Sequence, residues 1–384
     1  MEHRRSALGT LVALTIARIA FGYQVQTVAS LGPELVRAFH MGFTLLGTLV
    51  GLYMLPGVVS AIPAGVLARR LGDRRVVTAG LALMTIGSVL SALGGGPAGI
   101  GAGRILSGAG AVALTVLQGK IVAERYSGKS FTLAMGLMVG AFPVGIGIAQ
   151  LTQAPLAHAF AWPAAFLAGA AISAVALLVF ATTWTGAAHP PGMRLLVWPT
   201  RRECVLVLVS GLIWTSYNSG FANFLAYMPS WLAAHGHPRW VGDVVLPLAT
   251  WSNLPSIMLG SALATRFGPT PVFVFGTLMG VVAVGGVGLV DAPLLWGALF
   301  GVFASIQGGL IVEIGTLSAR PENRAVGMGL FYTTYYVGGA TIPALCGRAA
   351  DYMGDPSGAF LAAAGISILA LPFYWLHRRR ARII

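Results

Sequence analysis

The sequence predicts an all-α membrane protein in which twelve transmembrane helices form two pseudo-symmetric bundles of six. Three observations predict this fold: an apolar composition, a succession of long apolar runs, and short segments that recur half a chain apart. Of the 384 residues, 56% are hydrophobic and only 9% are charged, and the mean hydropathy is +0.80. This composition would not keep a soluble protein of this size monodisperse, so we expect the chain to lie in a lipid bilayer.

Twelve apolar runs follow one another, each long enough to cross a bilayer core, which takes about 20 residues at helical rise. Because backbone groups in lipid must bond within their own segment, we expect each run to be a helix. The first-half spans are expected at residues 8–31, 43–68, 76–93, 97–122, 131–156 and 162–183. The second-half spans are expected at residues 205–232, 240–264, 272–290, 294–317, 326–345 and 360–376. Kinks in spans two and eight are predicted by four prolines, Pro56, Pro63, Pro247 and Pro255.

Basic residues predict how the spans are oriented. When the amino terminus is placed inside, only Arg37, Arg239 and Arg348 fall outside. Apart from Arg18 and Arg104, which lie within spans, every other Lys and Arg then falls in an inner loop or end. The positive-inside rule therefore places both termini in the cytoplasm, and we expect the membrane to be a bacterial inner membrane. The net charge of +13 follows from this bias and requires no nucleic acid as a partner.

Two pairs of segments recur half a chain apart. RYSGKSFTLAMGL (125–137), which leads into the fifth span, parallels RPENRAVGMGL (320–330), which leads into the eleventh. GVLARRLGDRRVV (65–77) after the second span resembles GSALATRFGPTPVFV (260–274) after the eighth. A parallel repeat of six helices is typical of transporters.

The repeat predicts three parts of the chain. Residues 1–185 are expected to form the amino-terminal bundle, and residues 203–384 the carboxy-terminal bundle. The segment 186–202 between them contains Pro190, Pro191 and Pro199 and few apolar residues, so it is expected to be a cytoplasmic linker.

The loop after the second span resembles the signature of the major facilitator superfamily. That signature runs Gly, two residues, Ala, Asp, Arg, one residue, Gly, and then basic residues. The matching positions in this chain are Gly65, Ala68, Arg69, Arg70, Gly72, Arg74 and Arg75. The fourth span opens with GRILSGAGAVAL, which is similar to the family's arginine-containing motif through Arg104, Gly108 and Gly110. The resemblance covers the whole chain and implies a carrier that works by alternating access.

The signature loop departs from the family at one position. The acidic residue is replaced by Arg69, and Thr265 stands in the second-half copy. The resemblance implies that this loop latches the inner gate by charge pairing, so we hypothesise that Asp73 supplies the acid. The alternative is that Arg69, Arg70 and the second-half Arg266 only enforce topology around a glycine turn.

Arg18 and Arg104 interrupt apolar spans, where a cation is costly. A guanidinium keeps its proton, so each arginine needs a partner or an anion. From helical rise, Arg18 lies about 15 Å from the inner end of its span and Arg104 about 10 Å from the outer end of its own. The resemblance implies that spans one, four, seven and ten line a central cavity, where both could reach one anion. No Asp or Glu interrupts the first-half spans, so a carboxylate or similar oxyanion is the expected cargo.

Each arginine also has a structural alternative. Arg104 occupies a position common in the superfamily, where it could bond to backbone carbonyls. Arg18 could bond to a neighbouring carbonyl or hydroxyl. The pair resembles the arginine placement in the organic-anion branch of the superfamily, although Ala17 replaces the acidic neighbour common there.

Other polar and aromatic side chains fall at comparable depths and could orient a small ligand. The alternative for each is a role in helix packing. The candidates are Tyr23, Gln26, Tyr217, Asn218, Trp251, Asn253, Gln307, Tyr332 and Tyr335.

Glu313 is the carboxylate that lies clearly inside a span, and it is therefore the candidate proton site. The alternative is a gate carboxylate that pairs with Arg320 or Arg324. If Glu313 is not a proton site, the cargo could carry the proton, or transport could be exchange or facilitated diffusion.

We expect no enzyme activity, cofactor or metal site, because the sequence lacks a phosphate-binding Gly-Lys-Ser loop, hydrolase spacings and paired metal ligands. The preferred interpretation is a monomeric secondary transporter that takes up a small anion with protons. One alternative is efflux of drugs or metabolites by proton antiport. The other is a transport-inactive sensor or scaffold, which the short loops disfavour.

Overall fold

The protein is described by a computed structural model that covers residues 2–60, 70–184 and 198–381. Within these ranges the chain forms helices joined by turns and contains no strand. It divides into two units, each with its own hydrophobic core. The first unit comprises residues 1–34 and 52–193, and the second comprises residues 35–51 and 194–384.

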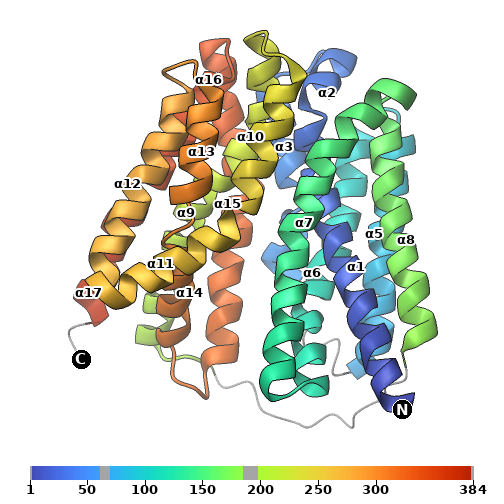
Figure 1. Cartoon of the computed structure of the whole chain (residues 1–384), viewed down its shortest axis with the longest axis vertical. Helices are drawn as coiled ribbons and strands as arrows, with labels where there is room; N and C mark the ends of the chain where they lie inside the picture. Colours follow the sequence, from blue (N-terminus) through green and yellow to red (C-terminus); the bar gives the residue numbers. More distant parts are fainter. Residues whose placement is uncertain (1, 61–69, 185–197, 382–384) are drawn as a thin grey trace. The chain divides into compact units, whose positions relative to one another are not determined.

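The described part of the first unit contains five long helices (Figure 1). They are α1 (Glu2–Ser30), α5 (Asp73–Leu93), α6 (Pro97–Arg125), α7 (Gly128–Phe160) and α8 (Pro163–Thr183). The short helix α2 (Gly32–Phe39) follows α1 and has residues in both units. The helix pairs α5–α6, α1–α7, α1–α8 and α5–α8 pack along their lengths. Gly22 of α1 lies against the carbonyl of Phe142, and Gly145 of α7 lies against the carbonyl of Ile19. A side chain at either glycine would separate α1 from α7, as expected for small residues at membrane helix contacts.

The second unit contains most of the other described helices (Figure 1). They are α3 (Phe43–Gly51), α9 (Arg201–Ala234), α10 (Arg239–Trp251), α11 (Asn253–Phe267), α12 (Pro269–Val287), α13 (Pro293–Phe303), α14 (Gly308–Leu317), α15 (Arg324–Met353), α16 (Ser357–Ser367) and α17 (Ala370–Ala381). Thr200 and Glu203 form a capping box that fixes where α9 begins.

Ten helical segments of the described chain are long and apolar enough to cross a membrane. The eighth expected span is the α10–α11 pair, which a turn at Ser252 divides into two shorter helices. The eleventh expected span is α15, which is 30 residues long. Each of the twelve expected spans therefore has a helical counterpart within the residues that the structure describes.

Proline accounts for most of the helix breaks. A proline has no N–H for the carbonyl four residues earlier, so it weakens the helix there. Breaks occur at 52–54, at 252 and at 368–369, just before Pro56, Pro255 and Pro372. The predicted kinks at Pro56 and Pro255 thus coincide with breaks, whereas Pro247 lies within the continuous helix α10. The fourth predicted kink, at Pro63, lies outside the described residues.

The segment 35–51 belongs to the second unit because α3 packs against α15. Asp351, near the end of α15, accepts hydrogen bonds from the backbone N–H groups of Phe43 at 2.6 Å and Thr44 at 2.8 Å. The Thr44 hydroxyl donates to the same carboxylate at 2.5 Å. Because the first N–H groups of a helix have no partner within it, Asp351 acts as an N-terminal cap supplied by another helix.

We expect Asp351→Ala to lower the free energy of unfolding by about 1 kcal/mol, the usual value of a helix cap. The measurement is the thermal unfolding of the purified protein. Asp243→Ala is the matched control, because Asp243 is exposed on α10 of the same unit. Equal stability of the two variants would contradict the capping role.

Candidate functional site

Arg18 lies half-buried in the middle of α1 and contacts two other helices. Its Nη1 donates to the hydroxyl of Thr115 on α6 at 3.0 Å. The guanidinium carbon lies 5.2 Å from the ring centre of Phe21 and 5.1 Å from that of Phe142. The Thr115 hydroxyl donates to the carbonyl of Ala111 at 2.8 Å, so its lone pairs face the arginine. These three neutral groups orient the guanidinium and bring no negative charge to it.

Arg104 lies deeper, with an exposed fraction of 2%. Its Nη1 and Nη2 donate to the α1 carbonyls of Gln24 at 2.9 Å and Val25 at 3.3 Å. Its guanidinium carbon lies 4.7 Å from the ring centre of Tyr53. The side chain therefore ties the last third of α1 to α6 through backbone carbonyls, which is the structural alternative raised for this residue.

Tyr23 and Gln26, the other candidates on α1, are both buried within the first unit. The hydroxyl of Thr152 donates to the Tyr23 hydroxyl at 3.4 Å, and the side-chain amide of Gln153 donates to the Tyr23 carbonyl at 3.0 Å. These contacts place Tyr23 at the junction of α1 and α7.

Gln24 is a polar residue of this region that the sequence did not single out. Its amide nitrogen lies within 3.3 Å of the carbonyls of Met84 and Gly169 and of the Ser173 hydroxyl. Its amide oxygen accepts from the Tyr53 hydroxyl at 3.3 Å. Gln24 thus joins α1 to α5 and α8, next to the carbonyl that Arg104 binds.

An aromatic cluster in the second unit contains several predicted candidates. The Trp214 ring centre lies 5.2 Å from that of Tyr217, 5.9 Å from that of Phe331 and 6.3 Å from that of Tyr335. Tyr332 meets Phe331 edge to face at 5.2 Å. The structure thus brings the three predicted tyrosines of this unit into one cluster. Trp214 and Phe331, at its centre, were not predicted from the sequence.

Asn218 and Asn253 lie at the edges of this cluster. The Asn218 amide donates to the carbonyl of Trp214 at 2.9 Å, and Asn253 is the first residue of α11. Trp251 is 47% exposed at the end of α10. Trp251 therefore lies at the surface, whereas Asn218 and Asn253 are half-buried.

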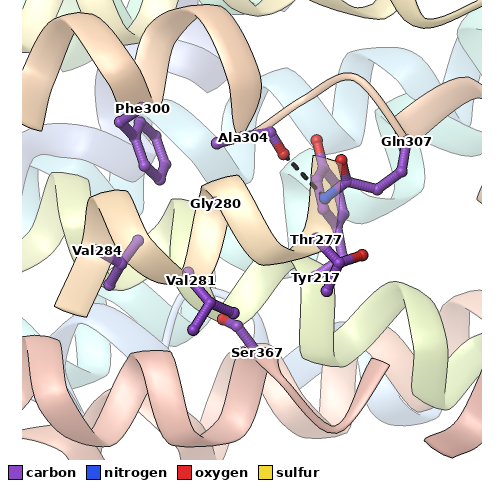
Figure 2. A pocket seen from close by; sticks show the side chains of 10 residues that line it. Tyr217, Thr277, Gly280, Val281, Val284, Phe300, Ala304, Gln307 and Ser367 are labelled. Carbon is purple, nitrogen blue, oxygen red and sulfur yellow. Dashed lines mark hydrogen bonds between the residues drawn. The ribbon is translucent and has the colours of Figure 1, made fainter. Parts of the chain in front are cut away.

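Gln307 lies in the turn between α13 and α14 with an exposed fraction of 3%. It lines a small cavity inside the second unit together with Tyr217, Thr277 and Ser367 (Figure 2). Its amide nitrogen donates to the carbonyl of Ala304 at 3.1 Å.

Glu313 is exposed on α14. Arg320, one of its two expected partners, instead forms an ion pair with Glu203, in which Nε of Arg320 donates to the Glu203 carboxylate at 3.1 Å. Asn323 also donates to Glu203 at 3.0 Å, so the start of α9 is joined to the turn before α15. Glu203 is a polar anchor that the sequence did not single out, although the Thr-x-x-Glu capping pattern marks it.

The predicted gating residues are only partly covered by the structure. Asp73, in the first turn of α5, pairs with Lys120 of α6 at 2.8 Å. Arg70 is exposed, and the Arg266 guanidinium carbon lies 5.2 Å from the ring centre of the neighbouring Phe267. Arg69 lies outside the described residues.

Two bacterial transporters are similar to this chain in sequence. The 3-(3-hydroxy-phenyl)propionate transporter of Escherichia coli K12 is 25% identical over 366 residues, which covers 90% of this chain and 86% of the relative. The inner membrane transport protein YajR of the same strain is 25% identical over 357 residues, which covers 85% and 74%.

Solved structures support the same fold. A D-xylose-proton symporter matches with a TM-score of 0.78 at 15% identity and covers 96% of this chain and 97% of its own. A bacterial homologue of the human lysosomal transporter Spinster, inward-facing and unoccupied, matches with a TM-score of 0.76 at 16% identity, covering 98% and 97%. At these identities the likeness concerns the fold alone.

The family model for the Major Facilitator Superfamily matches residues 14–343. This match covers most of the chain and agrees with the all-helical architecture and with the transporters that resemble it. The chain is therefore a multi-pass membrane transporter that belongs to the Major Facilitator Superfamily.

Proposed function

We propose that this transporter takes up a small organic anion with a carboxylate group, together with protons, by alternating access. Arg18 carries the proposal. It is a permanent cation in the middle of a membrane helix, half-buried, and oriented by a hydroxyl and two aromatic rings. A guanidinium presents parallel N–H groups that match the two oxygens of a carboxylate.

The surroundings of Arg18 favour a cargo that has an apolar body. The rings of Phe21 and Phe142 both contact the guanidinium, their centres lie 4.9 Å apart, and they could also pack against an aryl or alkyl group. One relative is named as a transporter of 3-(3-hydroxy-phenyl)propionate, a carboxylate joined to an aromatic ring. Both observations support an aromatic or short-chain carboxylate.

Arg104 has a different part in this proposal. Its two hydrogen bonds to α1 carbonyls hold the helix that carries Arg18. We therefore treat Arg104 as a positioning residue and Arg18 as the residue that binds the cargo. In the second unit, the aromatic cluster around Trp214, with Asn218 and Asn253, is the proposed source of further cargo contacts.

We expect Arg18→Gln to reduce uptake of the carboxylate by about 10-fold to 100-fold, because the cargo loses a charge-assisted hydrogen bond that contributes about 1.5–3 kcal/mol. We expect Arg18→Lys to reduce uptake as well, because an ammonium cannot offer two parallel N–H groups to the carboxylate. The measurement is carboxylate uptake into proteoliposomes, after a thermal-shift panel has identified a binding carboxylate. Arg239→Gln, at the exposed start of α10, is the control. Normal uptake by Arg18→Gln would reject the anion proposal.

We expect Arg104→Gln to lower thermal stability more than Arg18→Gln does. The substitution removes the two hydrogen bonds through which the guanidinium ties α6 to α1, and a bond to a charged group contributes about 1.5–3 kcal/mol. The measurement is the unfolding temperature of both variants without cargo. If Arg104→Gln keeps its stability and loses only cargo affinity, Arg104 contacts the cargo directly.

Glu313 remains the proposed proton site. We expect Glu313→Gln to remove the response of uptake to an imposed pH gradient while exchange of labelled for unlabelled cargo continues, because an amide cannot carry the proton. Proteoliposomes with and without the gradient provide the measurement. An unchanged response to the gradient would show that protons are coupled elsewhere or not at all.

A further inference from the structure

A small cavity lies inside the second unit, among α9, α12, α16 and the turn between α13 and α14 (Figure 2). Its volume is about 20 Å³. A site needs about 10–15 Å³ to hold one water molecule, so this cavity fits one and little more.

Three polar atoms around this cavity have no hydrogen-bond partner in the described part of the chain. They are Oγ1 of Thr277, Oε1 of Gln307 and Oγ of Ser367. The three side chains are 4%, 3% and 6% exposed. Buried polar atoms in native proteins nearly always have a partner, which can be an ordered water. Three such atoms around one cavity indicate a shared ligand.

Two helix breaks supply two of the cavity's three polar groups. Gln307 closes the turn between α13 and α14, and Ser367 is the last residue of α16 before the turn that leads to α17. Within the first turn, the Gln307 amide nitrogen donates to the carbonyl of Ala304, and its oxygen is left as an acceptor (Figure 2). Broken membrane helices are tolerated where side chains or water satisfy the backbone and polar groups at the break.

Two glycines make room for these polar groups. A side chain at Gly276 would clash with Oε1 of Gln307. A side chain at Gly220 would bring its Cβ to 2.9 Å from Oγ of Ser367. The positions of both oxygens thus depend on glycine at neighbouring positions of α12 and α9.

We propose that the cavity binds one water molecule that joins Thr277 of α12, Gln307 and Ser367. The water donates to the amide oxygen of Gln307, which can only accept. It then forms one bond to each hydroxyl, because a hydroxyl can turn to donate or to accept. Three bonds are the usual number for a buried water. The three oxygens without a partner belong to neutral side chains that line the cavity, which suits water better than a cation.

The proposal gives Gln307 a role apart from cargo recognition. Its amide oxygen would be used by water, and its amide nitrogen is used by Ala304. The water would connect α12 to the two broken spans and would hold the breaks at fixed positions. This inference does not rest on the proposed anion transport.

The sign of a stability change distinguishes a hydrated cavity from a dry one. Thr277→Val replaces a hydroxyl by a methyl group of similar size. If the cavity is dry, the substitution removes an unsatisfied hydroxyl and should raise the melting temperature. With water bound, it removes a partner of that water, and we expect the melting temperature to fall by about 1–3 °C.

Thr341→Val is the matched control. Thr341 is exposed on α15 and its hydroxyl donates to the carbonyl of Val337 in the same helix at 2.9 Å, so we expect no change. A melting temperature of Thr277→Val at or above that of the unmodified protein would overturn the proposal.

A structure of the unmodified protein at a resolution that shows waters gives a test that needs no variant. We expect one density peak at about 2.7–3.0 Å from all three oxygens. An empty cavity would overturn the proposal. A melting temperature that rises with sodium chloride, but not with choline chloride at equal ionic strength, would assign the site to a cation and would also overturn it.

Discussion

Polar groups inside a membrane span must find their partners within the protein, and the polar interior of both units depends on this constraint. Arg104 illustrates it most clearly. A charge with an exposed fraction of 2% is accommodated because two α1 carbonyls accept its N–H groups and the Tyr53 ring lies beside it. The Tyr53 hydroxyl in turn donates a hydrogen bond to the amide oxygen of Gln24. The amide nitrogen of Gln24 donates to backbone carbonyls of α5 and α8. One chain of polar contacts therefore connects four helices of the first unit.

The second unit meets the same constraint at its helix breaks. Ser256, in the first turn of α11, donates to the carbonyl of Val302 near the end of α13 at 2.6 Å. Tyr217 donates to the Ser305 hydroxyl, in the turn between α13 and α14, at 3.2 Å. A break thus exchanges backbone hydrogen bonds for contacts between helices, which ties its position to the neighbouring helices.

The helices could be predicted from the sequence more completely than the site. Apolar runs mark the spans because burial in lipid is a property of each segment by itself, and Pro56 and Pro255 mark breaks because proline acts on its own helix. The partners of Arg104 could not be predicted, since backbone carbonyls carry no signal of residue type. Trp214 was missed because an aromatic residue in an apolar run looks like any lipid-facing or core residue.

The ion-pair partner of Arg320 is also one that closeness in sequence did not predict. Glu313 and Arg320 lie close in sequence, which favoured pairing, but Glu203 reaches Arg320 from the start of another helix and accepts from Asn323 as well. The cap on α3 is likewise a contact that sequence distance hides, because Asp351 is more than 300 residues away in sequence from the helix it caps.

Arg18 and Arg104 look equivalent in sequence, yet their surroundings differ in a way that bears on function. Arg104 donates to carbonyls, whose partial negative charge solvates a guanidinium well and suits a permanent structural bond. Arg18 donates to a threonine hydroxyl and stacks near two rings, which are weaker acceptors. The proposed cargo carboxylate would replace a hydroxyl contact at Arg18, whereas at Arg104 it would have to displace two backbone carbonyls. The contacts of Arg18 with a hydroxyl and two rings therefore suit the proposed role in cargo binding better than the contacts of Arg104 do.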